Sequence, residues 1–268
     1  MAVLVSVIMP TYNCGKFIAE SIDSVLAQTV TDWELQIVDD CGTDNTEEVL
    51  APYLAQYPNI HYYRLPQNGG PAAARTEAIR RAGGKYCAFL DSDDLWTPDK
   101  LEKQLAFMER ENAKFSCTAF RMMDEGGADL HTVMVPPKKT TYNKCIRLSN
   151  PIGNLTAVYD QEALGKFEVP PIRKRNDFAL WLQILKKTDC CHGMEDVLGT
   201  YRAGRSGSVS HNKLAQAKYH WQLYHEIEGH NAARSAFEMG CWAFVKGTGI
   251  GLDKRTVQRE RRLPTCGF

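Results

Sequence analysis

The first hundred residues alternate between short, strongly apolar segments and segments whose apolar residues recur with helical periodicity. Residues 3–9 form an almost continuous apolar and β-branched run, which is typical of a strand buried on both faces of a parallel sheet. Residues 16–28 then show the spacing of an amphipathic helix. Further strand-like segments follow at 34–39, 60–65 and 86–90, each separated from the next by a helical pattern. This alternation predicts βαβ units, and therefore an α/β fold with a central, mostly parallel sheet flanked by helices.

Each of these predicted strands ends in a cluster of polar or flexible residues. The clusters are Pro10-Thr11-Tyr12, Asp39-Asp40, the turn Gln67–Gly70, and Asp91–Asp94. In open parallel sheets, ligands bind at the carboxyl ends of the strands. We therefore expect the four clusters to converge on one crevice. The chain contains neither GxGxxG nor GxxxxGK followed by Ser or Thr, which argues against a dinucleotide oxidoreductase and against a P-loop nucleotidase.

The most acidic of these clusters is Asp91–Asp94, where an apolar run gives way to three carboxylates within four residues. Carboxylates crowded at the end of a buried strand repel one another, and their pKa values rise unless a divalent ion or several hydrogen-bond donors compensate. Oxygen-rich sites of this kind suit Mg²⁺ or Mn²⁺ that also holds phosphate oxygens. The alternative is a surface loop whose Asp residues cap the helix that follows it.

Composition argues against several classes of protein. Lys+Arg and Asp+Glu both number 32 in a chain of 268 residues, so the overall charge gives no sign of a nucleic-acid-binding protein. The nine cysteines lack the paired CxxC spacing of a zinc site, and we expect free thiols in a reducing compartment. No run approaches the roughly 18 apolar residues of a membrane span, and the N-terminus does not resemble a signal peptide. We therefore expect a cytoplasmic protein that does not cross a membrane by itself.

The middle of the chain is less regular. Apolar spacing predicts a helix that starts at Thr97-Pro98-Asp99 and a second helix at 177–185. The Pro-, Lys- and Gly-rich residues 126–142 are expected to form a loop over the site. Strands are expected at 115–123, 154–159 and 197–202.

From residue 213 onward the pattern is helical and lacks strands, and the chain ends in a basic tail. We expect a division into a domain at 1–210 and a helical extension at 211–268. Two roles are open for the extension. Either its aromatic residues pack on the preceding domain, or they act with the basic tail to attach the protein to anionic lipid at the inner face of a membrane. The basic residues of the tail are Lys254, Arg255, Arg259, Arg261 and Arg262.

Four motifs, taken in order, resemble family 2 glycosyltransferases with the GT-A fold. They are VSVIMPTYN at 5–13, SVLAQT at 24–29, ELQIVDD at 34–40 and FLDSDDLW at 89–96. The resemblance is specific through about residue 105 and looser to residue 210, with some likeness to bacterial capsule and surface-polysaccharide members. It implies a nucleotide-sugar donor, usually UDP-linked, and an acceptor hydroxyl such as that of a lipid-linked glycan. It assigns residues 1–100 to a nucleotide-sugar-binding half and 101–210 to an acceptor-side half of one catalytic domain.

The same resemblance implies a donor site at the strand ends. The acidic cluster would hold Mn²⁺ or Mg²⁺ against the diphosphate, with Asp93 as the direct ligand and Asp91 shared between the ribose and the metal. Asp40 would accept a hydrogen bond from the uracil imide N–H, and Asp39 would brace its loop. The remaining donor contacts that the resemblance implies are Pro10, Thr11 and Tyr12 at the nucleobase and ribose, and Gly70, Arg75, Ser92 and Arg202.

Structural alternatives stay open for several of these residues. Asp94 either faces the acceptor or caps the helix that begins near Pro98. Arg75 either reaches the diphosphate or the base, or it lies solvated on a helix face. The cluster Pro10-Thr11-Tyr12 is also explained as a simple turn that ends a strand.

Inverting transfer needs a general base that takes the proton of the acceptor hydroxyl while this hydroxyl attacks the anomeric carbon. The resemblance points to Asp177, because family members carry a Glu-Asp pair before an aromatic-rich helix and this chain has Asn176-Asp177 there. A helix N-cap is the alternative role for Asp177. Family members also often carry a His after a Tyr-Arg pair, which this chain lacks. Arg202, Arg205 and His211 are candidates to replace it.

The sequence therefore predicts an inverting, metal-dependent glycosyltransferase, and two other classes stay open. A sugar-phosphate nucleotidyltransferase also uses a parallel sheet and paired Asp residues. It should carry a Gly-rich phosphate loop with Arg and Lys near its N-terminus, and residues 5–13 have none. A catalytically silent glycan- or nucleotide-binding protein of the same fold would keep the motifs without the transfer reaction.

Overall fold

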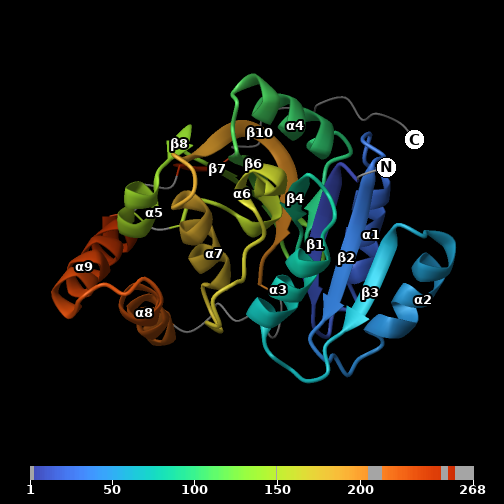
Figure 1. The fold of residues 1–268 in the computed structure, drawn as a ribbon, viewed down its shortest axis with the longest axis horizontal. Coiled ribbons are helices and arrows are strands. Elements are labelled where there is room, and N and C mark those ends of the chain that lie inside the picture. Colours follow the sequence, from blue (N-terminus) through green and yellow to red (C-terminus); the bar gives the residue numbers. More distant parts are fainter. Residues whose placement is uncertain (1–2, 149, 205–212, 249–252, 257–268) are drawn as a thin grey trace.

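The computed structural model describes residues 3–148, 150–204, 213–248 and 253–256. Figure 1 shows a central sheet with helices on both of its faces. The strands are β1 (Val5–Thr11), β2 (Trp33–Asp39), β3 (Ile60–Arg64), β4 (Tyr86–Phe89), β5 (Leu95–Trp96), β6 (Phe115–Met123), β7 (Asp129–Val135), β8 (Lys139–Thr140), β9 (Val158–Asp160), β10 (Cys191–Arg202) and β11 (Asp253–Thr256). The helices are α1 (Ile18–Leu26), α2 (Thr46–Gln56), α3 (Pro71–Arg81), α4 (Lys100–Arg110), α5 (Tyr142–Leu148), the 3₁₀ helix η1 (Asn154–Thr156), α6 (Gln161–Leu164), α7 (Asn176–Leu185), α8 (Lys213–Gln222), the π-helical turn η2 (Leu223–Ile227) and α9 (Ala232–Thr248).

The sheet has the order β11-β7-β6-β9-β4-β1-β2-β3, with β10 alongside β6. β1 to β4 run parallel to one another, as the alternating sequence pattern predicts. β9 runs antiparallel between β4 and β6, so the sheet is mixed beyond β4. The prediction of an α/β fold with a mostly parallel sheet flanked by helices is confirmed.

β1 lies in the middle of the sheet and is buried along its whole length. Because side chains of a strand alternate between its two faces, β1 contributes to two hydrophobic clusters. Val7 and Met9 pack with residues of α1, α2 and α4 in one cluster, whereas Ile8 packs with α3 and α7 in the other. Pro10 lies where β1 no longer has β4 as a neighbour, since β4 pairs only with Val5–Ile8. The missing N–H of proline is tolerated at such a position.

Residues 126–142, predicted as a loop, are largely β-structure, and that prediction is wrong. β7 pairs antiparallel with β6, and β8 pairs antiparallel with β10. The glycines and prolines that suggested a loop lie outside both strands. Gly126 and Gly127 form the turn before β7, with a φ of +89° at Gly127, and Pro136 and Pro137 separate β7 from β8. The loop-like composition of the residues around β7 and β8 therefore concealed both strands, including the antiparallel pair of β6 and β7.

Other boundaries also differ from the sequence expectations. Residues 154–159 form η1 followed by β9 rather than one strand. The strand expected at 197–202 begins earlier, at Cys191, and the helix expected at 177–185 is α7. The C-terminal part contains β11, which pairs antiparallel with β7, so the expectation that this part lacks strands is wrong.

The aromatic residues of the C-terminal helices divide into two groups. Tyr224 of η2 is fully buried in the cluster that contains α7. The ring of His220 in α8 lies 6.2 Å from the ring of Phe178 in α7. Phe237 and Phe244 of α9, by contrast, are 60% and 63% exposed. Packing on the preceding domain, one of the two roles expected for these aromatic residues, is therefore observed for Tyr224 and His220, whereas Phe237 and Phe244 are largely exposed.

Several sequence expectations fall outside the described residues. They concern the boundary at residue 210, the substitutes Arg205 and His211, and the tail residues Arg259, Arg261 and Arg262. The division into two domains stays a prediction. Among the helices that the structure describes, none combines the length and apolar character needed to cross a membrane.

Candidate active site

The carboxyl ends of β1, β2 and β4 lie at one edge of the sheet, toward the bottom of Figure 1. Thr11 pairs with Asp39 in the register of β1 and β2, and the amide of Asp40 donates to the carbonyl of Thr11 at 2.9 Å. The amide of Leu90 donates to the carbonyl of Ile8 at 3.1 Å, which aligns the end of β4 with β1. The strand ends thus come together as the parallel topology predicts.

Asp39 makes several hydrogen bonds within the protein, whereas the residues at the end of β1 keep groups available for a ligand. Asp39 accepts hydrogen bonds from the amide of Gly42 at 2.9 Å and from the hydroxyl of Tyr62 at 3.1 Å, so it braces its loop as expected. The buried hydroxyl of Thr11 has no hydrogen-bond partner among the described residues, and Tyr12 is 48% exposed. The end of β1 therefore offers one hydroxyl and one exposed aromatic ring.

Asp40 ties the end of β2 to the start of α3. Its carboxylate oxygens accept hydrogen bonds from the amides of Gly69 and Gly70 at 2.7 and 2.9 Å. Gly70 has a φ of +80°, a conformation that glycine adopts without strain. Burial raises the pKa of Asp40 above its ordinary value, against the lowering effect of the two amides. A hollow of about 240 Å³, lined in part by Gly70 and Arg173, lies beside this junction. The contact of Asp40 with a uracil imide stays a prediction.

Asp91–Asp94 form a loop between β4 and β5, here called the acidic loop. Two of its carbonyls accept hydrogen bonds from residues that are remote in sequence. The carbonyl of Ser92 accepts from the thiol of Cys14 at 3.2 Å, and the carbonyl of Asp93 accepts from Nε of Arg202 at 3.0 Å. Ser92 itself is buried. Tertiary contacts therefore hold the backbone of the acidic loop in place.

Asp94 is 1% exposed. One of its carboxylate oxygens accepts a hydrogen bond from the amide of Arg202 at 2.9 Å, and the other has no partner among the described residues. Burial raises the pKa of Asp94 well above its ordinary value, and the charges of Asp93 and Asp91 add to the rise. The residue that precedes α4 is Asp99, so the helix-capping alternative for Asp94 is wrong. The expectation that Asp94 faces the acceptor stays a prediction.

Arg75 joins the acidic loop to the start of α7. Its side chain is 5% exposed, so the alternative of a solvated position on a helix face is wrong. Nη2 of Arg75 lies 3.1 Å from a carboxylate oxygen of Asp91, and Nη1 donates to the side-chain oxygen of Asn176. Burial raises the pKa of Asp91, Arg75 opposes the rise, and the charges of Asp93 and Asp177 add to it. Asp91 and Asp177 are therefore close enough to influence each other, and one guanidinium links the elements that carry them.

Asp177 is the second residue of α7 and is half-buried. The residue before the helix is Arg175, with a φ of +65°, so the N-cap alternative for Asp177 is wrong. One carboxylate oxygen of Asp177 lies 3.4 Å from the side-chain nitrogen of Asn150, a distance at the long end of the hydrogen-bond range. A carboxylate offers about four acceptor positions, so this contact leaves capacity for a substrate hydroxyl.

Arg202 is buried, and the protein uses its guanidinium for internal contacts. Nε and Nη1 donate to the carbonyls of Asp93 and Glu125, both at 3.0 Å. Nη2 donates to the carboxylate of Glu20 at 2.7 Å, and the guanidinium lies 4.7 Å from the centre of the Phe17 ring. Arg202 therefore positions the acidic loop. Its contact with a nucleotide sugar stays a prediction.

Sequence reasoning missed the residues that hold these groups in position. Glu20 lies 182 residues from its partner Arg202, and Asn176 lies 101 residues from its partner Arg75. Local patterns cannot mark pairs at such separations. Asn176 stands out in the sequence only as the neighbour of Asp177, and Asn150 carries no signal at all.

The acidic loop has the chemistry of a partial metal site. Within the described part of the chain, no three His, Cys, Asp or Glu side chains are arranged to hold a metal ion by themselves. Mg²⁺, however, is commonly bound by one or two carboxylates together with substrate phosphates. The Asp91 side chain is 31% exposed and Asp93 is half-buried, whereas Asp94 is turned inward. These residues fit a divalent ion whose coordination is completed by a diphosphate.

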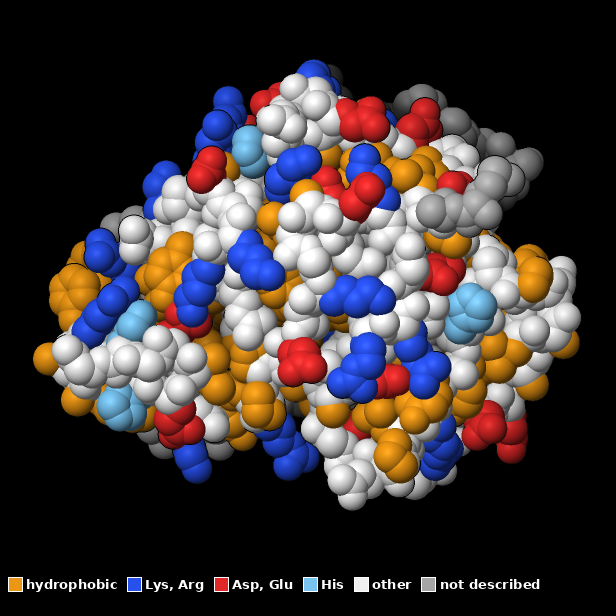
Figure 2. Space-filling model, viewed as in Figure 1, with side chains coloured by type: hydrophobic (Ala, Val, Ile, Leu, Met, Phe, Trp, Pro, Cys, Tyr) orange, Lys and Arg blue, Asp and Glu red, His pale blue; other side chains and the backbone are white. Residues whose placement is uncertain are grey.

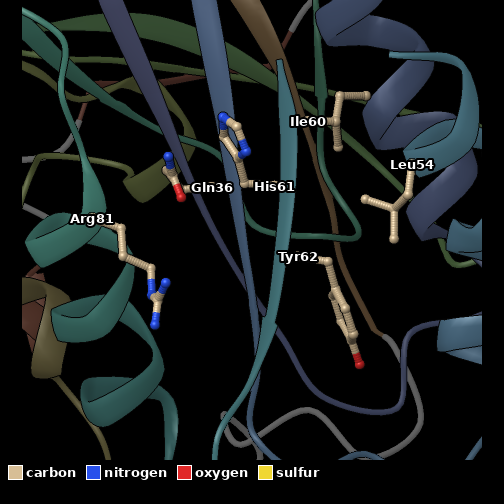
Figure 3. Close-up of a pocket in the computed structure, with 6 residues that line it drawn as sticks. All are labelled: Gln36, Leu54, Ile60, His61, Tyr62 and Arg81. Carbon is tan, nitrogen blue, oxygen red and sulfur yellow. The ribbon is translucent and has the colours of Figure 1, made fainter. Parts of the chain in front are cut away.

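A separate hollow of about 560 Å³ lies at the edge of the sheet. Figure 3 shows its lining on the two sides of β3, with Gln36, His61 and Arg81 on one side and Leu54, Ile60 and Tyr62 on the other. None of the predicted site residues lines it. The candidate active site is therefore at the strand ends and not in this hollow.

Comparisons with known proteins agree with this geometry. The family model described as "Glycosyl transferase family 2" matches residues 6–166. The "Putative teichuronic acid biosynthesis glycosyltransferase TuaG" of Bacillus subtilis is 42% identical over 252 residues, which cover 94% of this chain and 97% of the relative. The "UDP-Glc:alpha-D-GlcNAc-diphosphoundecaprenol beta-1,3-glucosyltransferase WfgD" of Escherichia coli is 35% identical over 232 residues, which cover 86% of this chain and 89% of the relative.

The fold is also similar to that of a solved structure. The crystal structure of S. aureus TarS 1–349 in complex with UDP-GlcNAc superposes with a TM-score of 0.65 at 23% sequence identity. The match covers 88% of this chain and 70% of that one. At this identity the likeness supports the fold alone, and the motifs and the two relatives support the family. The chain belongs to glycosyl transferase family 2 and is a glycosyltransferase with the GT-A fold.

Proposed function

We propose that this glycosyltransferase is inverting and metal-dependent, and that it moves a sugar from a UDP-sugar to an acceptor hydroxyl. The observation that carries the proposal is the link made by Arg75. It contacts Asp91 on the donor side and Asn176 on the acceptor side, next to Asp177. One buried guanidinium thus relates the carboxylate that faces the diphosphate to the carboxylate that faces the acceptor. Family membership leaves the sugar-phosphate nucleotidyltransferase without support.

Asp177 is the proposed general base. It takes the proton of the acceptor hydroxyl as the oxygen attacks the anomeric carbon from the side opposite the nucleotide. Its position at the start of α7 and its long contact with Asn150 leave the carboxylate able to accept this proton. α7 and Asn150 orient the carboxylate and leave acceptor positions on its oxygens for the hydroxyl of the acceptor.

The strand ends are the proposed donor site. Tyr12 offers an exposed ring for stacking on the nucleobase, Thr11 offers a buried hydroxyl without a partner in the described chain, and Asp40 stands beside the hollow lined by Gly70. Asp93 and Asp91 would hold Mn²⁺ or Mg²⁺, which neutralises the charge that develops on the leaving diphosphate. Burial raises the pKa of Asp91, and the charge of Arg75 opposes this rise while its Nη2 holds the carboxylate in place.

The proposed acceptor is a lipid-linked glycan in the synthesis of a bacterial surface polysaccharide. The name of WfgD specifies a diphosphoundecaprenol-linked acceptor, and TuaG is named for teichuronic acid biosynthesis. An acceptor of this kind is held in a membrane, so we also propose that the protein works at the cytoplasmic face of the membrane as a peripheral protein.

A panel of nucleotide sugars tests the donor and the metal together. We expect one UDP-sugar to raise the melting temperature in the presence of Mn²⁺, because a ligand that binds the folded state stabilises it by mass action. EDTA should abolish the effect, and the NMR spectrum of the product should show an anomeric configuration opposite to that of the donor. Stabilisation by GDP-sugars alone would contradict the UDP assignment, equal stabilisation in EDTA would contradict the metal, and a retained configuration would contradict inversion.

A further inference from the structure

The outer face of α9 is apolar and exposed. Ala233, Ala236, Phe237, Gly240 and Phe244 recur at the spacing that places residues on one side of a helix, and all five are exposed. The two Phe side chains are 60% and 63% exposed. We call these five residues the α9 ridge. A contiguous exposed apolar surface is typical of an interaction site.

The opposite face of α9 is anchored in the protein. Glu238 is 1% exposed, and its carboxylate oxygens lie 2.7 Å from Nδ1 of His230 and 3.1 Å from Nε of Arg234. Val245 is buried on the same side, and α5 packs against the helix. These contacts determine which face of α9 turns outward. Phe237 and Phe244 are therefore presented by a packed helix.

Exposed basic side chains lie on the helix that packs against α9. Lys144 and Arg147 are exposed on α5, which packs against α9. The acidic side chains nearby are mostly withdrawn, because Glu228 and Glu238 are 1% exposed and Glu226 alone is exposed among the described residues 217–245. In Figure 2, hydrophobic, basic and histidine side chains, with a few acidic ones, lie together at the end of the molecule where Figure 1 places α8 and α9.

An exposed apolar ridge with exposed basic side chains on the neighbouring helix matches the anionic surface of a membrane. Aromatic side chains of such helices enter the headgroup region, while Lys and Arg meet anionic headgroups. A second copy of the chain fits less well, because a symmetric contact through this end of the molecule would bring like basic charges of the two copies together. We infer that the α9 ridge docks the protein on an anionic membrane surface. The inference rests on the proposed function, in which the acceptor is lipid-linked.

α8 connects this surface to the candidate active site. The ring of His220 in α8 lies 6.2 Å from the ring of Phe178, which follows Asp177 in α7. Nζ of Lys174 lies 5.8 Å from the centre of the Tyr219 ring. Docking through α9 therefore holds α7 and its general base in a fixed relation to the lipid surface that supplies the acceptor.

Co-sedimentation with vesicles tests the inference on the full chain. The probes are vesicles of phosphatidylcholine alone and vesicles that also contain phosphatidylglycerol. We expect the wild type to bind the anionic vesicles. The partition coefficient of Phe237→Ser/Phe244→Ser should be at least about ten-fold lower, because this variant lacks both aromatic rings that would enter the headgroup region. Lys144→Glu/Arg147→Glu should weaken binding to anionic vesicles alone. Leu130→Ser, which changes an exposed apolar side chain on β7, and Arg110→Glu, which changes an exposed base on α4, are the matched controls.

Two readouts separate the membrane surface from its alternatives. Light scattering reports whether the wild-type chain is a dimer that the two Phe substitutions dissociate, and such a dimer without vesicle binding would overturn the inference. Equal vesicle binding by the wild type and Phe237→Ser/Phe244→Ser would overturn it as well. Sugar transfer is measured in parallel on a water-soluble short-chain acceptor. The Phe variant should keep this activity and lose transfer to vesicle-embedded acceptor, whereas vesicle binding without transfer to either acceptor would support the surface and contradict the proposed function.

Discussion

The acidic loop and the start of α7 both carry carboxylates of the candidate active site, but the fold treats them differently. The acidic loop is held by Cys14 and Arg202, and one of its carboxylates, Asp94, is wholly buried. Asp177 at the start of α7 is half-buried, and among the residues that the structure describes it makes one long side-chain contact, with Asn150. A loop that must hold an ion and a diphosphate needs fixed geometry, whereas a base must be free to accept a proton. The proposed roles of the two regions can be distinguished by substitutions in one region whose effects on both donor binding and turnover are measured.

Asp177→Asn should give the largest effect. We expect the turnover number to fall by about 10²- to 10⁴-fold, because the amide cannot accept the proton of the acceptor hydroxyl. The affinity for the UDP-sugar should change by less than about two-fold, because donor binding belongs to the other region. Steady-state kinetics and calorimetric titration measure the two quantities. Asp129→Asn, an exposed carboxylate on β7, is the control, and a wild-type rate for Asp177→Asn would remove the general-base assignment.

Asp93→Ala should affect the acidic loop without affecting the base. We expect the affinity for UDP in Mn²⁺ to fall by about 10- to 100-fold, or about 1.4–2.8 kcal/mol, because one of the two carboxylates that fit the ion is lost. In EDTA the variant and the wild type should bind UDP alike. Calorimetric titration in both conditions provides the comparison. Unchanged affinity in Mn²⁺ would show that Asp93 is not a metal ligand.

Arg75→Lys should disturb both regions at once. Lys cannot donate to Asp91 and Asn176 in the geometry of a guanidinium, so one buried acceptor is left without a donor. We expect the free energy of unfolding to fall by about 1–2 kcal/mol. Donor affinity and turnover should fall together. Arg80→Lys, on the same helix but exposed, is the matched control for urea unfolding, and equal stability of the two variants would contradict the link.

Asp94→Asn should have the smallest effect and a stabilising sign. The folded-state pKa of Asp94 is raised, so its proton binds more tightly in the folded state and stability is lost as the pH rises above about 4. The neutral amide removes this loss while its oxygen can still accept from the amide of Arg202. We expect the melting temperature at pH 7 to rise by about 2–4 °C, the shift that about 1 kcal/mol causes in a chain of this size. The gain should disappear near pH 4.

Asp99→Asn is the control of opposite sign for that pH profile. The pKa of Asp99 is lowered, chiefly by Lys103 and also by Thr97, so its charge stabilises the fold above about pH 4 and this stabilisation is lost as the pH falls. Asp99→Asn should therefore lower the melting temperature slightly at pH 7. A lower melting temperature for Asp94→Asn as well would show that burial of its charge is not the dominant cost.

The convergence of the strand ends could be predicted from the sequence because its signals are local. A strand buried on both faces is a continuous apolar run, and the polar residues that follow it must lie at the edge where parallel strands end, as Thr11, Asp40 and Asp91 do. The partners that tune these residues could not be predicted. Glu20 lies 182 residues from its partner Arg202, and Asn150 lies 27 residues from its partner Asp177. Contacts at such separations leave no local pattern in the sequence.

The second half shows a different limit of sequence reasoning. The hairpin of β6 and β7 was obscured because the residues around its strands, Gly126-Gly127 and Pro136-Pro137, dominate the local composition. α9 illustrates the converse case. Its apolar residues are recognisable in the sequence, but only packing reveals that Glu238 faces inward while Phe237 faces outward.

The central position of β1 bears on how this enzyme can be changed. Val7 and Met9 face one hydrophobic cluster while Ile8 faces the other, so every substitution of these residues disturbs the packing of one layer of helices or the other. The buried part of the strand is therefore poorly suited to mutational drift or to engineering. Tyr12, which is 48% exposed, is a more tolerant position for changing the proposed donor contacts.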